Sequence, residues 1–127
     1  MAIEVRHKLP VSADRVWQIV GDPGRIDWVA GVAACDFDGE IRRFQMQGAG
    51  QLAERIVQRD DETRCLRYSV VESTPPLASH LATLTIAEDS AGCEIIWQTE
   101  VQPTAVEPFI EQGMRGSLAQ LESVLGI

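Results

Sequence analysis

The sequence predicts an α+β protein in which a curved antiparallel sheet of seven strands wraps around one long C-terminal helix. Short segments that alternate apolar and polar residues follow one another between residues 32 and 102, with connections short enough for consecutive hairpins. Residues 104–127 then carry apolar side chains at spacings of three and four, the pattern of one helical face. Strands followed by a helix, without βαβ alternation, indicate an α+β fold.

Length and charge limit the classes of function. With 127 residues the chain is long enough for a proper core, and we expect one domain, 1–127. The formal net charge of −8 argues against nucleic acid and anionic membrane surfaces as partners, because both require a basic face. No stretch is long enough to span a membrane, and strand-like sequence begins almost at once. We therefore expect no signal or transit peptide and a cytoplasmic location.

Cysteine and histidine give no metal or redox pattern. Cys35, Cys65 and Cys93 match neither a zinc motif nor a redox pair, so we interpret them as small hydrophobic residues in a reducing compartment. The two histidines, His7 and His80, form no HxH or HxxxH spacing. The sequence therefore predicts no metal site and no cofactor.

One strand and two short helices are expected before residue 32. The alternation over residues 3–9 predicts a half-buried strand. Ser12 then caps a short helix that Gly21 stops. Asp22-Pro23 is a start signal for a second short helix, which carries Trp28.

The remaining strands form an antiparallel meander whose inward face can be assigned from parity. We expect these strands at about 32–38, 41–47, 51–59, 63–72, 79–88 and 93–102. Short hairpin loops fix the register and place the inward residues in three rows. The central row is Phe44, Glu54, Tyr68, Leu84 and Trp97, and the flanking rows are Met46, Leu52, Val70, Ala82 and Thr99, and Arg42, Ile56, Leu66, Ile86 and Ile95.

The C-terminal helix carries a capping signal at each end. Thr104 and Glu107 form a capping-box pair, although Pro108 also allows a first turn at Glu107. Gly126 is placed for a left-handed cap. The apolar stripe between them is Val106, Phe109, Ile110, Gly113, Met114, Ser117, Leu118, Leu121, Val124 and Leu125.

Gly113 lies at the centre of this stripe, where we expect it to face the small residues Ala82 and Thr99. Glycine inside a helix costs about 0.5–1 kcal/mol relative to alanine, so it needs a reason. One explanation is close contact between the helix backbone and a bulky sheet side chain. The other is that small residues leave room for a ligand.

A few polar side chains interrupt the apolar inward face: Arg42, Glu54, Tyr68, Thr99 and, near the rim, His80. Glu54 is predicted opposite Tyr68, with Arg42 on the diagonal. A carboxylate in an apolar cavity is costly unless it is paired, and its pKa shifts accordingly. The group allows a structural ion pair, an anchor for the polar end of a ligand, or an acid/base pair for dehydration or enolisation. Glu54, Tyr68 and Arg42 are therefore the candidate catalytic residues.

Several stretches resemble one known family: Ala13-Asp14-Arg15-Val16-Trp17, residues 39–42, Ala53-Glu54-Arg55-Ile56, residues 66–72 and Ile95-Ile96-Trp97. With the order of the elements, they are similar to the START-like helix-grip (SRPBCC) superfamily, and within it to the bacterial polyketide cyclase/dehydrase-like branch. The resemblance covers the whole chain. It implies a helix-grip fold with a deep, largely apolar cavity between sheet and helix, and ligands such as lipids, hormones, isoprenoids or polyketides.

Three functions remain open. The first is binding of an apolar small molecule, such as a lipid, isoprenoid or polyketide-like compound, in a cavity on the order of a few hundred Å³ between sheet and helix. The second is a polyketide cyclase/dehydratase-type enzyme that uses Glu54, Tyr68 and Arg42. The third is a protein-interaction module with a closed cavity, and a homodimer is a candidate assembly. The expected ligand-binding residues are Trp28, Phe44, Glu54, Tyr68, His80, Ala82, Leu84, Trp97, Thr99, Phe109, Gly113 and Met114.

Overall fold

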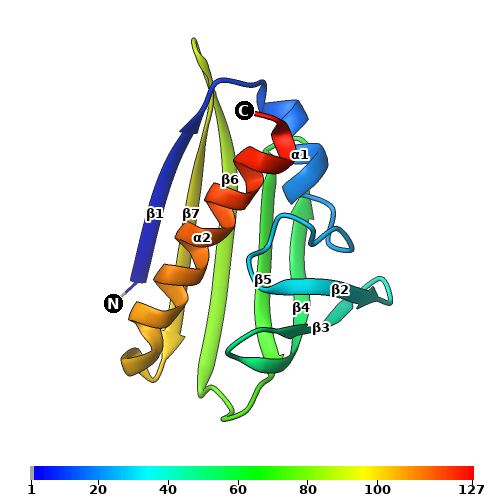
Figure 1. Ribbon diagram of the computed structural model, residues 1–127, viewed down its shortest axis with the longest axis vertical. Coiled ribbons are helices and arrows are strands. Elements are labelled where there is room, and N and C mark those ends of the chain that lie inside the picture. The colour runs from blue at the N-terminus through cyan, green and yellow to red at the C-terminus, as the bar shows by residue number, and fades with distance from the viewer. Residues whose placement is uncertain (1) are drawn as a thin grey trace.

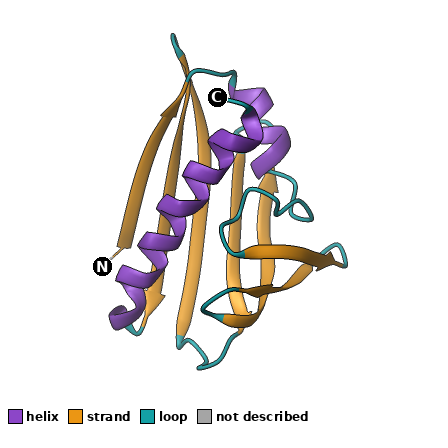
Figure 2. Ribbon diagram, viewed as in Figure 1, coloured by secondary structure: helices purple, strands orange, loops and turns teal. Residues whose placement is uncertain are grey.

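The computed structural model describes residues 2–127, in which one curved antiparallel sheet carries both helices on its concave side (Figures 1 and 2). The strands are β1 (Ala2–Leu9), β2 (Val32–Phe37), β3 (Ile41–Met46), β4 (Gly50–Asp60), β5 (Cys65–Glu72), β6 (Ser79–Asp89) and β7 (Gly92–Gln102). They lie in the order β1-β7-β6-β5-β4-β3-β2, so only β1 is out of sequence order. The predicted α+β fold, with seven strands and a long C-terminal helix, is confirmed. Within residues 2–127, no helix has the length and apolar character needed to cross a membrane.

Helix α1 (Ala13–Val20) begins and ends at the residues that the sequence indicated. The Ser12 hydroxyl accepts a hydrogen bond from the Arg15 N–H at 3.2 Å, which satisfies one of the free donors of the first turn. Gly21 follows the last turn, where a Cβ atom would lie 2.5 Å from the Trp17 ring. A larger residue would therefore force Trp17 out of its buried position.

The second short helix predicted at Asp22-Pro23 is wrong, because residues 22–31 form successive turns instead. The Asp22 carboxylate accepts the Gly24 N–H at 3.0 Å, and the Asp22 carbonyl accepts the Arg25 N–H at 3.0 Å. Such side-chain bonds compete with helix formation. The turns still bury Trp28, which lies against the sheet.

The inward faces of the strands are as predicted, but the register is correct only between β6 and β7, where Leu84 pairs with Trp97. In three other hairpins the partner differs by two residues, so the predicted pairs Phe44–Glu54, Glu54–Tyr68 and Tyr68–Leu84 are wrong. A shift of two keeps each side chain on its face, because strand side chains alternate with a period of two. The observed pairs are Phe44–Leu52, Arg42–Glu54, Glu54–Val70, Ile56–Tyr68 and Tyr68–Ala82.

Strand β4 contains an irregularity at Val57, between Ile56, which pairs with Tyr68, and Gln58, which pairs with Arg67. Such a β-bulge adds one residue to a strand and changes which side chains face inward beyond it. Arg59, two residues further, consequently reaches α1: its guanidinium lies 5.5 Å from the centre of the Trp17 ring and donates to the Gly21 carbonyl. Strand β4 therefore contributes a side chain to each end of the concave face.

Helix α2 (Glu107–Leu125) follows a short 3₁₀ turn, η1 (Thr104–Val106), and crosses the concave face diagonally (Figure 1). The predicted capping box is wrong, since Val106 is the N-cap residue and makes no side-chain cap bond. Gly126 adopts the predicted left-handed cap, with φ of 77°. Glu122 holds α2 to β1 through a 2.7 Å contact between Oε2 and the His7 Nε2 atom.

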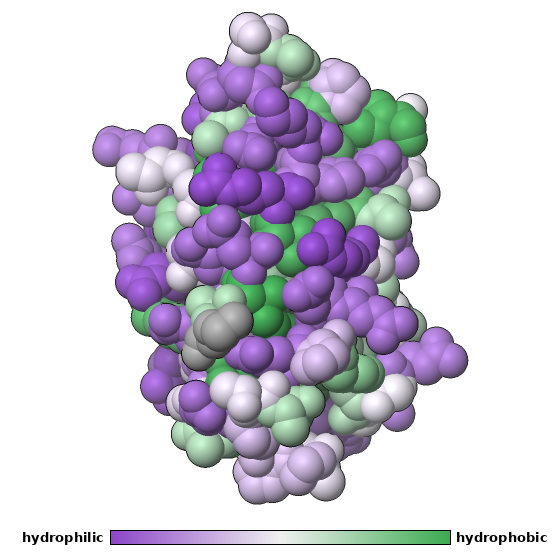
Figure 3. Space-filling view, turned by 90° about the vertical axis from the view of Figure 1, so that its left-hand side faces the viewer, coloured by the Kyte–Doolittle hydropathy of each residue, from purple (hydrophilic) through white to green (hydrophobic). Residues whose placement is uncertain are grey.

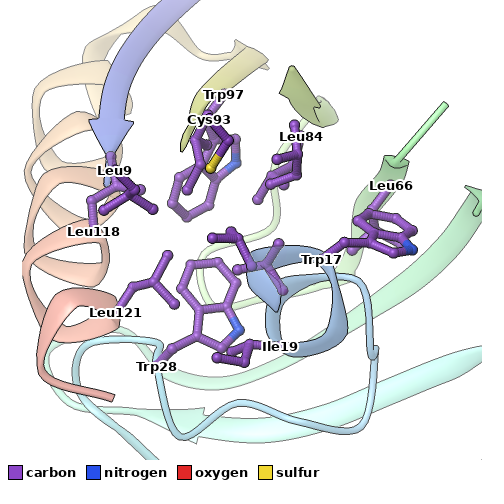
Figure 4. Packing of buried hydrophobic residues seen from close by; sticks show 14 of the residues in the cluster. Leu9, Trp17, Ile19, Trp28, Leu66, Leu84, Cys93, Trp97, Leu118 and Leu121 are labelled. Carbon is purple, nitrogen blue, oxygen red and sulfur yellow. The ribbon is translucent and has the colours of Figure 1, made fainter. Parts of the chain in front are cut away.

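The core fills the space between α1, α2 and the sheet (Figure 4). Trp28 and Trp97 meet at its centre, with ring centroids 5.5 Å apart, and Leu121 of α2 points toward them. Large aromatic side chains bury much apolar area, so this contact is a main support of the fold. The outer surface on the β1 side is mainly hydrophilic, with small separate apolar patches (Figure 3).

Candidate functional site

The centre of the site is a buried ion pair between Arg42 on β3 and Glu54 on β4. The two residues lie directly opposite each other, and the Arg42 Nε atom donates to Glu54 Oε1 at 2.7 Å. Their side chains are only 7% and 11% exposed. Arg42 was predicted on the diagonal from Glu54, and the tighter β3–β4 hairpin explains the difference, because Gly50 already pairs with Met46. Val70 of β5 continues the same cross-strand row.

Two further contacts fix the Arg42 guanidinium. Its Nη1 atom donates to the Pro23 carbonyl at 3.3 Å, so a turn after α1 helps to hold it. Its Cζ atom lies 4.8 Å from the centre of the Tyr68 ring, a cation–π distance. The Tyr68 hydroxyl in turn accepts the Trp97 Nε1–H at 3.1 Å. Arg42, Glu54, Tyr68 and Trp97 thus form one connected group, as their predicted common face implied.

Burial dominates the electrostatics of this group. It raises the pKa of Glu54, while the charge and hydrogen bond of Arg42 act in the opposite direction. It also raises the pKa of Tyr68, and the nearby Glu54 carboxylate adds to that effect. Tyr68 is therefore a neutral phenol at any physiological pH.

Two atoms of the ion pair remain available to a ligand. Among residues 2–127, the buried side-chain polar atoms without a hydrogen-bond partner are Arg67 Nε and Glu107 Oε2. Glu54 Oε2 and Arg42 Nη2 also have no partner within those residues, and because the two side chains are nearly buried, each of these atoms has only a small contact with solvent. The pair therefore presents one acceptor and one donor to a molecule that approaches the concave face.

His80, predicted near the rim, is half-buried on β6, opposite Val101 of β7. Its ring centroid is 6.0 Å from that of Tyr68, and its Nδ1 atom accepts the Val70 N–H at 3.0 Å. Burial lowers the pKa of His80 to about 4, so the ring is neutral at pH 7. This bond places His80 next to the row of Arg42, Glu54 and Val70.

Within the part of the chain that the structure describes, side chains fill the space under α2 where a cavity was expected. Ala82 and Thr99 are 0% and 1% exposed, which leaves no room for even a water molecule beside them. The Thr99 hydroxyl donates to the Met114 sulfur at 3.6 Å. The other predicted lining residues Trp28, Phe44, Leu84 and Trp97 are buried in the same way.

Gly113 does not face Ala82 and Thr99 as predicted, because Met114 takes that position. Gly113 is exposed, and a Cβ atom there would meet nothing within 4 Å. The next turn of α2 shows its direction: Ser117 accepts the Ala30 N–H at 3.0 Å, and Gly116 lies beside Ala30. Gly113 and the half-exposed Phe109, one turn earlier, therefore lie on the side of α2 that continues from this loop. This placement does not test whether Gly113 or Phe109 contacts a ligand, so both contacts stay predictions.

Solvent reaches the concave face mainly on its β3–β6 side. Here the inward residues Met46, Leu52, Val70 and His80 are half-buried rather than buried. We call these four residues, with Arg42 and Glu54, the open half of the concave face. Met46, Leu52 and Val70 were predicted to face inward, but they were not among the residues expected to bind a ligand. Their exposure depends on where α2 crosses the sheet, which no sequence pattern indicates.

Other parts of the surface hold hollows without comparable chemistry. One, of about 300 Å³, lies between the end of β1 and the β6–β7 turn, and another, of about 200 Å³, lies near Ser79 and Gln102. Neither includes residues of the ion pair. Within residues 2–127, no three His, Cys, Asp or Glu side chains are grouped so that they could hold a metal ion.

Known proteins share this architecture. The protein XoxI from Bacillus cereus is similar with a TM-score of 0.88 and 18% identity, over 97% of this chain and 94% of that chain. Norcoclaurine synthase from Thalictrum flavum is similar with a TM-score of 0.76 and 22% identity, over 98% of this chain and 85% of that chain. The di-domain ARO/CYC BexL from the BE-7585A biosynthetic pathway is similar with a TM-score of 0.82 and 17% identity, over 97% of this chain and 45% of that chain.

At these identities the structural likeness establishes the fold alone. No curated protein matches the sequence. The family model described as polyketide cyclase / dehydrase and lipid transport, however, matches residues 1–126. The fold is the helix-grip fold that the sequence motifs predicted, and the chain belongs to the polyketide cyclase/dehydrase and lipid transport family.

Proposed function

We propose that the protein binds a small, mainly apolar molecule on the open half of the concave face, with a hydroxyl or amine group of that molecule donating to Glu54 Oε2. The observation that carries this proposal is the unequal use of the two Glu54 oxygens. Arg42 occupies Oε1 at 2.7 Å, whereas Oε2 has no partner within residues 2–127 and is within reach of solvent. A ligand with a donor can complete the group at little cost, because the pair is already held in place.

The surroundings of Glu54 favour an apolar body on such a ligand. Met46, Leu52 and Val70 give the open half partly exposed apolar surface on either side of the ion pair. The solved norcoclaurine synthase, which shares the fold, is in complex with dopamine and hydroxybenzaldehyde, two aromatic compounds with hydroxyl groups. The family description, which includes lipid transport, also supports a ligand of this kind.

The test compares two compounds that differ by one hydroxyl group, tetralin and tetrahydronaphthol. Both are titrated into ¹⁵N-labelled protein, and affinity is measured from the shifts of the backbone resonances of β3–β6. We expect tetrahydronaphthol to bind the wild-type protein more tightly by about tenfold, because a hydrogen bond to a charged acceptor contributes roughly 1.5–3 kcal/mol.

Glu54→Gln is the decisive variant. Arg42 Nε can donate only to the amide oxygen, so the amide nitrogen must take the place of Oε2 and present a donor instead of an acceptor. A hydroxyl group can still accept from that amide nitrogen, but the bond is neutral and weaker, so the preference for tetrahydronaphthol should fall from about tenfold to about threefold in a protein that still folds. Glu72→Gln is the matched control, because Glu72 pairs with Arg43 in an exposed ion pair. Equal loss in both variants, or binding of neither compound, would contradict the proposal.

A second candidate function is a cyclase or dehydratase reaction in which Glu54 is the acid/base group. The observation that favours it is the raised pKa of Glu54 beside an oxygen that solvent can reach. A carboxyl group whose pKa is raised keeps its proton to a higher pH than usual and can deliver it to a leaving hydroxyl. The test is the dehydration of a β-hydroxyketone by the wild-type protein and by Glu54→Gln. Equal rates for the two proteins would exclude this role.

A further inference from the structure

The edge between β5 and β6 ends in an unusual exchange of hydrogen-bond partners. The ladder between these strands runs to the pair Tyr68–Ala82, so the next inward residues to face each other are Val70 and His80. The Val70 N–H donates to the His80 side chain, at Nδ1, with a distance of 3.0 Å. The His80 carbonyl instead accepts the Ser69 hydroxyl. The imidazole is thus part of the sheet's own bonding.

This bond fixes the tautomer of His80. A backbone N–H can only donate, so Nδ1 must carry its lone pair toward Val70 and cannot hold a proton. Burial keeps the ring neutral at pH 7, because it lowers the pKa to about 4. A neutral imidazole has one N–H group, and here that group must be Nε2–H.

The Nε2–H group points to no partner within residues 2–127. His80 Nε2 makes no hydrogen bond with those residues, and it is not among the buried polar atoms that lack one, so solvent reaches it. Glu54 and His80 lie two strands apart, on either side of Val70, which places their Cα atoms about 10 Å from each other. Besides the Arg42 donor, the open half therefore presents an acceptor at Glu54 and a second donor at His80, with the apolar Val70 between Glu54 and His80.

We propose that His80 is a specificity residue whose Nε2–H donates to an acceptor oxygen of the ligand, so that the site selects molecules that carry a carbonyl or similar acceptor in addition to a hydroxyl. The inference rests on the proposed function and narrows its ligand to a hydroxy-carbonyl compound with an apolar body. Val70 acts as the positioning residue, since its N–H sets which ring nitrogen faces the ligand. A purely donating group, such as an ammonium, has no partner at His80.

The tautomer is tested without any ligand. Long-range ¹H–¹⁵N spectra of the labelled protein at neutral pH distinguish a protonated ring nitrogen from an unprotonated one. The chain has two histidines, so the His7→Gln variant assigns the signals. We expect an unprotonated Nδ1 and a protonated Nε2 for His80. A proton on Nδ1 would overturn the inference.

Ligand selection is tested with tetralin and α-tetralone, which differ by one carbonyl group. The wild-type protein should bind α-tetralone about fivefold more tightly, as one neutral hydrogen bond allows. His80→Asn keeps an acceptor near the position of Nδ1 for the Val70 N–H but has nothing at Nε2, so the preference should be lost. His80→Gln puts an amide nitrogen near the position of Nε2 and should keep part of it. A merely structural His80 would give the opposite order, because only Asn preserves the bond to Val70.

The outcomes separate this inference from the Glu54 anchor. The role of His80 is overturned if the wild-type protein binds tetralin and α-tetralone equally, or if the preference for α-tetralone survives in His80→Asn. In either case the role of Glu54 as an anchor is still decided by the comparison of tetralin with tetrahydronaphthol. Binding of none of the three compounds overturns both. If His80→Asn does not fold, the wild-type spectrum decides: addition of α-tetralone must shift the His80 Nε2–H signal, and an unchanged signal contradicts the proposal.

Discussion

Arg42 and Glu54 face each other across β3 and β4, with 2.7 Å between Nε and Oε1 and almost no exposure to solvent. Two opposite charges in such a place are costly to desolvate, and their attraction mainly offsets that cost. The presence of the pair is therefore weak evidence that it stabilises the fold. The consequences for stability can be measured separately from those for binding.

Removal of Arg42 alone should be severely destabilising. Arg42→Met leaves the Glu54 carboxylate buried without its partner, and we expect a loss of about 3–5 kcal/mol in the free energy of unfolding at neutral pH. The double variant Arg42→Met with Glu54→Leu should be near neutral or more stable. Urea denaturation of the wild type and of both variants measures this. A double variant as unstable as Arg42→Met would show that the pair holds the fold together.

The cost of Arg42→Met should also depend on pH, because burial raises the pKa of Glu54 and Arg42 no longer opposes the effect. A group whose folded pKa is raised contributes its stability below the unfolded pKa and loses it as the pH rises. The variant should therefore be closer to the wild type at about pH 5 than at about pH 8. Denaturation curves of the two proteins across this range test the sign, and a constant difference would refute it.

His80 should make the wild-type protein less stable in acid. Its folded pKa of about 4 lies below the ordinary value of 6.5, so the unfolded chain binds the proton more readily. This contribution is fully present above about pH 6.5 and is lost as the pH falls toward 4. His80→Asn, which does not titrate there, should show a flatter dependence of unfolding free energy on pH between these values. The check is a comparison of the two slopes, and equal slopes would mean that His80 is not held neutral.

Two glycines should respond in opposite ways to alanine. Gly21→Ala brings a Cβ atom to 2.5 Å from the Trp17 ring, so we expect a loss of about 1–3 kcal/mol from the resulting repacking. Gly113→Ala meets nothing within 4 Å and removes a flexible residue from a helix, which should add about 0.5–1 kcal/mol. Thermal unfolding of the wild type and both variants measures these two changes in stability. A destabilising Gly113→Ala would mean that α2 approaches another surface at this residue.

The sequence predicted the parts of the fold that depend on local patterns. Alternation along β6 and β7 indicated which side chains face inward, and the short Asp89–Gly92 connection set their register correctly. The error of two residues elsewhere arose from where each hairpin ladder closes, as at Gly50, and from irregularities in the β4–β5 ladder. Neither depends on hydrophobic pattern, since a shift of two leaves the pattern unchanged.

The same reasoning explains what was missed in the site. Arg42, Glu54 and Tyr68 could be placed on one face by parity, and the structure brings them together. The filled space beside Thr99 could not be predicted, because it depends on which α2 residue points at the sheet. The predicted stripe of ten positions is wider than the part of α2 that contacts the sheet. The Met114 side chain fills the space beside Thr99 by its volume, which the spacing of residues along the helix does not reveal. The bond from Val70 to His80 likewise depends on where the β5–β6 ladder ends.

The extra residue at Val57 has a consequence for how this sequence can vary. On one side of it β4 supplies Glu54 to the open half, and on the other it supplies Arg59 to α1. Deletion of Val57 would leave a regular ladder in which Ile56 still pairs with Tyr68 and Arg59 with Leu66, so the contact of Arg59 with α1 and the ion pair of Glu54 would both persist. Pairing Val57 in an unbroken ladder would instead shift Arg59 by one residue to the outer face and detach it from α1, because a shift of one reverses every side chain beyond it.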